Sequence, residues 1–115
     1  MKTVEKNIEI FIEESVNHNA AIEIGDHKKA NNAAKKIDKS FENIKKFGRE
    51  GREALLELLD HERKEVSAMA AAYSLKYNPD KSLKVLKKLS KDKGILGFRA
   101  SKAIETYQSG KWAIE

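Results

Sequence analysis

Residues 54–80, ALLELLDHERKEVSAMAAAYSLKYNPD, decide the fold class of this chain. A leucine-rich segment is followed there by a segment rich in alanine, with Ala68, Ala70, Ala71 and Ala72 in close succession. Small side chains that point in several directions around a helix let neighbouring helices approach it on more than one side. We therefore predict that the alanine-rich segment is a central helix, packed inside the domain. The alternative interpretation is that the alanines only favour helix formation.

The length and composition predict one highly charged helical domain. The chain has 115 residues, of which 40% are hydrophobic and 36% charged, with one proline and no cysteine. A chain of this length buries roughly two thirds of its unfolded surface in one core. No stretch approaches the roughly 20 apolar residues of a membrane span, and glutamates interrupt the apolar residues near the N-terminus, so we expect no membrane segment and no signal peptide. The prediction is a cytoplasmic protein, which the absence of cysteine fits.

The formal net charge of +5 is spread unevenly along the chain. Residues 1–26 carry two lysines against six acidic side chains, and residues 27–52 carry nine basic side chains against three acidic ones. Residues 53–77 are slightly acidic, and residues 78–115 are basic again. Lysines at helical spacing most often form a solvated helix face. The alternative is a basic surface that binds an acidic partner.

The spacing of apolar residues predicts six helices. Glycine adopts a left-handed conformation after a helix without steric cost, and a side-chain oxygen before a helix accepts a bond from a free N–H group of its first turn. Proline suits the first helical position and ends the preceding helix. The first predicted helix ends at Gly25, the second runs from its cap Asp26 to near Gly48, and the third covers residues 50–59. The fourth runs from its cap Asp60 to about Tyr77. The fifth follows the boundary at Asn78 and Pro79, and the sixth covers residues 95–109, between Gly94 and Gly110.

In the first predicted helix, residues three and four positions apart form one apolar stripe, which we expect to be buried. The members of this stripe are Val4, Ile8, Phe11 or Ile12, Ser15, Val16 and Ala20. A second stripe holds Glu5, Glu9 and Glu13, which we expect to face solvent.

Two of the predicted helix pairs repeat along the chain at a constant offset. Apolar type is kept at six pairs of positions, namely Leu55 and Val85, Leu56 and Leu86, Leu59 and Leu89, Val66 and Leu96, Ala70 and Ala100, and Tyr77 and Tyr107. A period of roughly 30 to 45 residues built from two antiparallel helices is typical of α-solenoids such as HEAT and armadillo repeats. We therefore predict an all-α fold, a short HEAT-like α-solenoid in which a right-handed stack of three antiparallel helix pairs forms a single domain over residues 1–115.

Three segments of the chain resemble a known family. They are EIGDHKKANNAAKKI at residues 23–37, REALLELLDHERKEVSAMAAAYSL at 52–75 and GILGFRASKAIETYQSGKW at 94–112, and together they cover about half of the chain. In this order and spacing the chain resembles a small bacterial family of HEAT-like helical proteins that is catalogued as a domain of unknown function. The resemblance implies an all-helical repeat fold and supplies no catalytic residues. It also implies a loose association with the neutralisation of bacterial toxins.

Two Asp-His dipeptides, Asp26-His27 and Asp60-His61, raise the question of a metal site. Carboxylate and imidazole are ligands of zinc and manganese, but such sites need three or four converging ligands. Both aspartates stand where helix caps are expected, so we predict capping and no metal site.

Asn31 and Asn32 lie early in the second predicted helix, where asparagine is a poor choice. Their amides are expected to reach either a backbone carbonyl in the next repeat, which we favour, or an external ligand.

No arrangement of nucleophile and base is recognisable in the sequence. Eight serines are present, yet none lies in a strained turn or beside a recognisable base. The pairs Gly48 with Gly51 and Gly94 with Gly97 flank loops and do not form a phosphate-binding motif. The prediction is a protein that is not an enzyme and uses no cofactor.

A basic groove is the remaining candidate site. In a solenoid the second helix of each pair tends to line the concave side, which predicts a binding surface formed by Lys35, Lys39, Arg63, Ser67, Arg99 and Lys102. Such a groove attracts an acidic protein or a phosphate backbone. The same geometry places the lysines of the fifth helix, Lys81, Lys84, Lys88 and Lys91, on the convex side.

These features predict a non-enzymatic protein-interaction module, and the most concrete version is an immunity protein that binds and neutralises a bacterial toxin. The alternative is a nucleic-acid-binding HEAT-like protein that uses the basic concave groove, although the sequence lacks an evident aromatic platform for stacking single-stranded bases. A structural subunit or homodimer is the third hypothesis. The expected partner is another protein, with nucleic acid as the alternative and no membrane.

Overall fold

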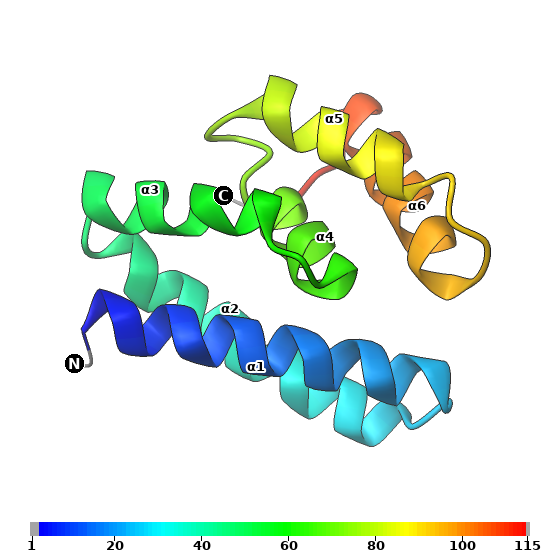
Figure 1. Ribbon diagram of the computed structural model, residues 1–115, viewed down its shortest axis with the longest axis horizontal. Helices are drawn as coiled ribbons and strands as arrows, with labels where there is room; N and C mark the ends of the chain where they lie inside the picture. Colours follow the sequence, from blue (N-terminus) through cyan, green and yellow to red (C-terminus); the bar gives the residue numbers. More distant parts are fainter. Residues whose placement is uncertain (1–2, 115) are drawn as a thin grey trace. The chain divides into compact units, whose positions relative to one another are not determined.

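The structure is a computed structural model that describes residues 3–114. Every regular element in these residues is a helix (Figure 1). The elements are α1 (Val4–Glu23), α2 (His27–Lys45), α3 (Arg49–Glu57), the 3₁₀ helix η1 (Leu58–Asp60), α4 (Lys64–Tyr73), α5 (Pro79–Leu89) and α6 (Ile95–Gln108). The predicted all-α class is confirmed. The helices divide into two compact units, Met1–Glu57 and Leu58–Glu115. The single domain expected over residues 1–115 stays a prediction.

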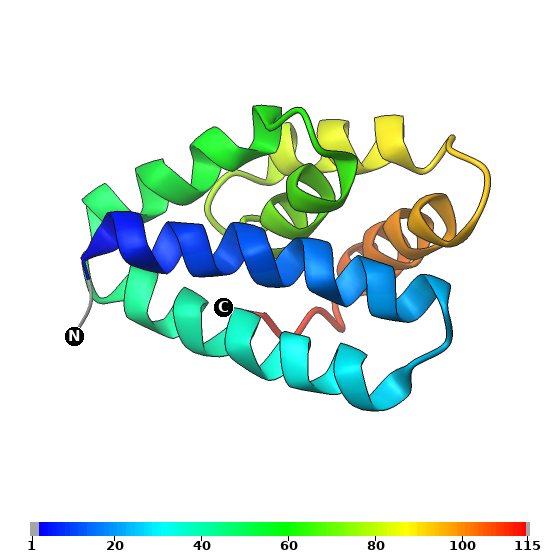
Figure 2. The same ribbon diagram turned by 60° about the horizontal axis from the view of Figure 1, so that its bottom comes forward.

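In the first unit, α1 and α2 lie side by side and antiparallel (Figure 1 and Figure 2). The turn between them follows the sequence signals. Gly25 has a φ of +73°, which only glycine adopts without strain, and the Asp26 side chain accepts a hydrogen bond of 3.0 Å from the backbone N–H of Lys29. The end of the first predicted helix at Gly25 and the cap Asp26 are therefore confirmed.

A hydrogen-bonded pair of asparagines, of which Asn7 is buried and Asn43 half-buried, fixes the register of α1 against α2. The side chain of Asn7 is fully buried; its Nδ2 donates to the carbonyl oxygen of Thr3 at 2.8 Å, and its Oδ1 accepts from Asn43 Nδ2 at 3.2 Å. A polar group buried between helices is satisfied at one alignment only, so such a pair specifies register. The expected buried stripe is partly wrong here, since Asn7 is enclosed whereas Ala20 is exposed and Ile8 is half-buried.

Two glycine pairs shape the tight turns before α3 and α6. Gly48 and Gly94 have φ angles of +61° and +102°, and each is followed three residues later by a buried glycine. A methyl group on Gly51 would collide with the carbonyl oxygen of Ile44, and one on Gly97 would collide with that of Asp92. The same Gly-x-x-Gly arrangement therefore lets a helix start close against the preceding backbone once in each unit.

The second unit begins differently from the prediction. The third predicted helix ends at Glu57, and residues Leu58–Asp60 form a 3₁₀ turn. Helix α4 starts at Lys64, so Asp60 does not cap it; the Asp60 carboxylate instead lies 3.1 Å from the Lys81 ammonium. The reason is that Leu58 and Leu59 are buried and that Ser67 Oγ donates to the carbonyl oxygen of Leu59 at 2.6 Å, which holds the turn against α4.

Helix α4 and the turn after it are enclosed, as the alanine-rich sequence predicts. Every residue from Val66 to Leu75 is buried or half-buried, and Val66, Ala70, Ala71 and Leu75 have no exposed surface. Within the second unit α4 packs against η1, α5 and α6. Alanine allows this because its side chain adds little width to the helix. The fourth predicted helix is nevertheless shorter than expected, since it ends at Tyr73.

Helices α5 and α6 complete the second unit. Pro79 occupies the first turn, as the sequence predicts, and the Asn78 side chain, for which no cap was predicted, accepts from the backbone N–H of Lys81 at 3.2 Å. The start of α3 at Arg49 recurs as the start of α5 at Pro79, and that of α4 at Lys64 recurs as that of α6 at Ile95. Both intervals are close to the predicted period. Helix α6 ends before Gly110, whose φ is +80°.

Replacing Asn43 with alanine is expected to destabilise the first unit by about 1 kcal/mol, because Asn7 loses the donor that reaches its Oδ1. Urea unfolding followed by circular dichroism measures the effect. The control is Asn31→Ala on the same helix, an exposed position, which is expected to be neutral or slightly stabilising. Equal stability of the two variants would contradict a role for the asparagine pair.

Replacing Ala70 with tryptophan is expected to destabilise the protein by about 1 to 3 kcal/mol or more, because no space surrounds its methyl group. Thermal unfolding measures the effect against Ala20→Trp, in which an exposed alanine receives the same side chain. A melting temperature of Ala70→Trp equal to that of the wild type would show that α4 is not enclosed.

Candidate binding surface

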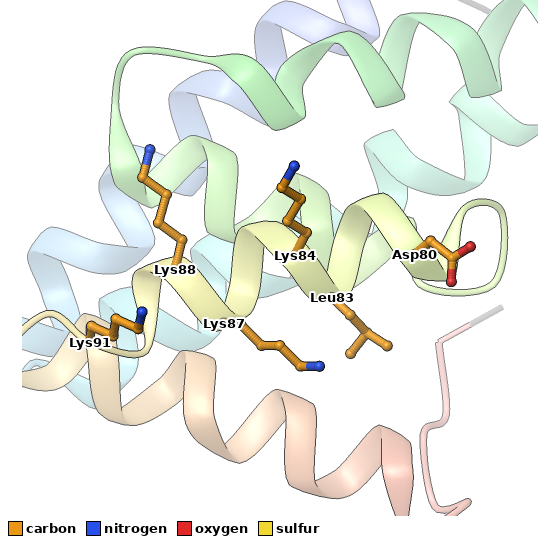
Figure 3. A pocket seen from close by; sticks show the side chains of 6 residues that line it. All are labelled: Asp80, Leu83, Lys84, Lys87, Lys88 and Lys91. Atoms are coloured by element: carbon orange, nitrogen blue, oxygen red, sulfur yellow. The ribbon is translucent and has the colours of Figure 1, made fainter.

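The second unit carries a row of exposed lysines along α5. Ser82, Leu86 and Leu89 are the buried side of this helix, which turns its other side to solvent. That side and the turn after the helix present four exposed lysines, here called the lysine face: Lys84, Lys87 and Lys88 on α5, and Lys91 two residues beyond its end. Together with Asp80 and Leu83 they line an open surface hollow of about 440 Å³ (Figure 3). Lys84 and Lys88 extend to one side of α5, whereas Lys87 and Leu83 extend toward α6.

The lysine face lacks ion pairs within residues 3–114, although neighbouring lysines have them. Lys81 lies 3.1 Å from Asp60, and Lys64 lies 3.0 Å from Asp92. None of the four lysines of the face has such a partner in the described part of the chain. Their charges add up along the exposed surface of α5 and the turn after it, so the face attracts anions.

An exposed aromatic ring lies on α6 of the same unit. Phe98 is 62% exposed, and Ile95, one turn earlier on the same side of the helix, is 40% exposed. The ammonium of Lys102 lies 5.6 Å from the centre of the Phe98 ring, within the range of a cation–π contact. The sequence prediction named Lys102 and overlooked Phe98. The signal was present, since Phe98 stands off the apolar stripe of Leu96, Ala100 and Ala103.

Arg99 follows Phe98 and is half-buried. Burial lowers the pKa of its guanidinium, because a desolvated cation is less stable than a hydrated one. Arg99 still carries its charge at neutral pH, since the pKa of an arginine lies far above 7. An anion placed beside it would offset part of the cost of burial.

The predicted groove residues fall in both units. Lys35 and Lys39 are exposed on α2 of the first unit. The other four belong to the second unit, where Arg63 is exposed and paired with Glu65 at 3.4 Å, and Lys102 is exposed and lies 3.7 Å from Glu105. Ser67 is buried, and its hydroxyl donates to the backbone of Leu59, so it faces no ligand. A common groove formed by these residues stays a prediction.

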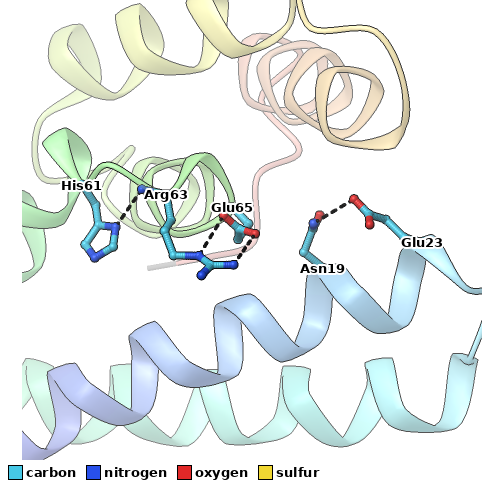
Figure 4. A network of polar contacts seen from close by, with 5 residues as sticks. All are labelled: Asn19, Glu23, His61, Arg63 and Glu65. Atoms are coloured by element: carbon cyan, nitrogen blue, oxygen red, sulfur yellow. Dashed lines mark hydrogen bonds and ion pairs between the residues drawn. The ribbon is translucent and has the colours of Figure 1, made fainter.

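Figure 4 shows two sets of polar contacts, which occupy different units. In the second unit, His61 Nδ1 accepts from the backbone N–H of Arg63 at 3.0 Å, and Arg63 contacts both carboxylate oxygens of Glu65. His61 thus organises the turn before α4. In the first unit, Asn19 Nδ2 donates to Glu23 at 3.2 Å, and the Asn19 Oδ1 atom is buried without a partner in the described residues.

Asn31 and Asn32 of α2 do not make the hydrogen bonds that the sequence predicts. Both Asn31 and Asn32 are exposed, and neither amide has a hydrogen-bond partner among residues 3–114. The favoured interpretation, a bond to a backbone carbonyl, is therefore wrong. A ligand contact stays a prediction.

The two buried serines of the first unit donate to the backbone of their own helices. Ser15 and Ser40 donate to the carbonyl oxygens of Phe11 and Ile37 in the preceding helix turn.

Within residues 3–114 no three His, Asp or Glu side chains converge as metal ligands. No helix in that part of the chain is both long enough and apolar enough to cross a membrane.

No protein-family model matches the chain, and no curated protein matches it. Among solved structures, the chain is similar to the crystal structure of the protein RPA1889 from Rhodopseudomonas palustris CGA009. The two share 18% sequence identity with a TM-score of 0.87, over 100% of this chain and 96% of the other. At this identity the likeness shows a common all-helical fold and nothing about function.

Proposed function

We propose that the chain is a non-enzymatic interaction module that binds an acidic segment of another protein. The observation that carries the proposal is the lysine face of α5, four neighbouring exposed cations that lack ion pairs within residues 3–114. Like charges held side by side repel each other, and an acidic partner relieves that repulsion while it is steered toward the surface. Helix α5 is buried through Ser82, Leu86 and Leu89, which leaves its lysines exposed to solvent.

We further propose that the helices form a short HEAT-like α-solenoid of three stacked helix pairs, related to the family that the sequence resembles. The antiparallel pair α1–α2 and the packing of α5 on α6 support this. The recurrence of the starts of α3 and α4 as those of α5 and α6 supports it as well. Repeat proteins of this kind present extended binding surfaces rather than enclosed pockets.

The most concrete version of the function is an immunity protein that occludes a bacterial toxin. Such a partner offers charges of its own, and the chain carries exposed charge of both signs. Glu5, Glu9 and Glu13 are exposed at intervals of four residues on α1, while α5 presents the lysine face. A toxin with a basic active site would meet the glutamates, and an acidic one would meet the lysines.

Nucleic-acid binding is the second candidate function. It is favoured by the seven basic side chains among residues 84–102, where Asp92 is the only acid and is paired with Lys64. A phosphate backbone binds such a surface with a strong dependence on salt concentration.

Affinity capture from the native cell extract tests the leading proposal. The tagged protein is expected to recover one protein partner in stoichiometric amount. The double substitution Lys84→Glu with Lys88→Glu is expected to abolish recovery, because it replaces two cations of the lysine face with anions. The matched control is Lys35→Glu with Lys39→Glu, an exposed pair at the same spacing on α2, which is expected to retain the partner.

Three results would count against the leading proposal. Recovery of no stoichiometric protein would remove it. Loss of the partner only in the Lys35 and Lys39 variant would place the binding surface on α2 instead of α5. A gel shift with DNA or RNA that weakens with salt and with Arg99→Glu, in the absence of a protein partner, would establish the second candidate.

A further inference from the structure

The first two turns of α6 carry an apolar patch at the basic end of the second unit. Three large apolar side chains in residues 3–114 are exposed to solvent, namely Ile24, Ile95 and Phe98. Ile95 and Phe98 stand one turn apart on the same side of α6. A single exposed apolar side chain is common on protein surfaces and needs no explanation. A pair that includes an aromatic ring with well over half its surface in water is typical of contact sites, because binding removes that surface from water.

The surroundings of this patch are cationic. The short connection from α5 to α6 contains the exposed Lys91 and Lys93, and Lys102 lies over the Phe98 ring. The nearest acid in the sequence, Asp92, is occupied by Lys64 at 3.0 Å. Arg99 is half-buried and has no anionic partner in the described residues. A partner that covers Phe98 therefore has to bring negative charge with it, since a basic one would add to the repulsion.

We propose that Ile95 and Phe98 are the apolar anchor of the interface, and that they receive a large apolar side chain from an acidic segment whose carboxylates contact the lysine face. This inference rests on the proposed binding of an acidic protein segment and adds to it a specificity determinant. The cations steer and align the segment, and the ring selects segments that carry leucine or an aromatic residue among their acids. Interfaces commonly combine a central apolar anchor with charged surroundings in this way.

The Phe98 ring remains available for this role although the Lys102 ammonium lies 5.6 Å from its centre. A cation over one face of a phenyl ring leaves the other face and the edge of the ring accessible. The Glu105 carboxylate lies 3.7 Å from the Lys102 ammonium, so it would repel an acidic side chain of the partner at that point. The apolar contact is therefore expected with the ring itself and the charged contacts with Lys87, Lys88 and Lys91.

Two synthetic peptides of equal length and equal negative charge test the inference. One carries leucines among its glutamates and the other carries alanines at the same positions, and both are labelled for fluorescence anisotropy at low salt. The leucine peptide is expected to bind at least about fivefold more tightly than the alanine peptide. Phe98→Ala is expected to remove this preference and to leave the affinity for the alanine peptide unchanged. Lys87→Glu with Lys88→Glu is expected to weaken both.

The matched control is Ile24→Ala, which removes an exposed apolar side chain from the first unit and is expected to change neither affinity. Circular dichroism confirms that each variant is folded, which is expected because the substituted side chains are exposed. Equal binding of both peptides, unaffected by Phe98→Ala, would overturn the anchor while the proposed function stands. Binding of neither peptide would refute the proposed function itself.

Two further outcomes would replace the partner. A single-stranded oligothymidylate that binds more tightly than both peptides, and loses affinity with Phe98→Ala, would show that the ring stacks on bases. Sedimentation of the protein alone that reveals an oligomer, dissociated by Phe98→Ala, would show that a second copy of the chain covers the patch.

Discussion

The second unit depends on one packing constraint, the enclosure of α4 by its neighbours. Ala70 and Ala71 have no exposed surface, and within the second unit α4 packs against η1, α5 and α6. Small side chains let such neighbours approach a helix closely. Close approach of this kind leaves no room for adjustment, because protein interiors are packed as densely as organic crystals. The positions of α5 and α6, and with them the lysine face and Phe98, follow from this contact. The function of this unit therefore depends on the side chains that the packing leaves exposed to solvent.

Backbone geometry at the helix starts supports the same arrangement. The turns before α3 and α6 each combine a glycine with positive φ and a second glycine that has a carbonyl oxygen directly against it. In the second unit this turn determines where α6 begins, and Ile95, Phe98 and Lys102 then fall on one outward side by helical spacing. The connection thus sets both the position of the helix and the composition of its exposed surface. A side chain at Gly97 would move the whole patch.

The all-α class, most helix ends and the central alanine helix could be predicted from the sequence, because these depend on local spacing and on residue size. Asp26 and Asp60 show where that reasoning ends. Both precede a predicted helix, yet only Asp26 caps one, since the buried Leu58 and Leu59 and the bond from Ser67 hold the chain around Asp60 in another turn. Asn7 was missed because its partner, Asn43, is remote in sequence. The prediction of the binding surface was also wrong at two residues. Ser67 looked available and is buried, whereas Phe98, which stands off the apolar stripe, was overlooked.

The central claim is that α4 is the most enclosed helix of the second unit and holds it together. Native-state hydrogen exchange measured by NMR tests this most directly, because it reports the free energy of opening at each backbone amide. The account predicts that the amides of Ala70 to Ser74 exchange only through complete unfolding of the unit and are its slowest. Amides of α4 that exchange as fast as those on the exposed side of α6 would contradict it, since a helix that opens on its own cannot be what positions its neighbours.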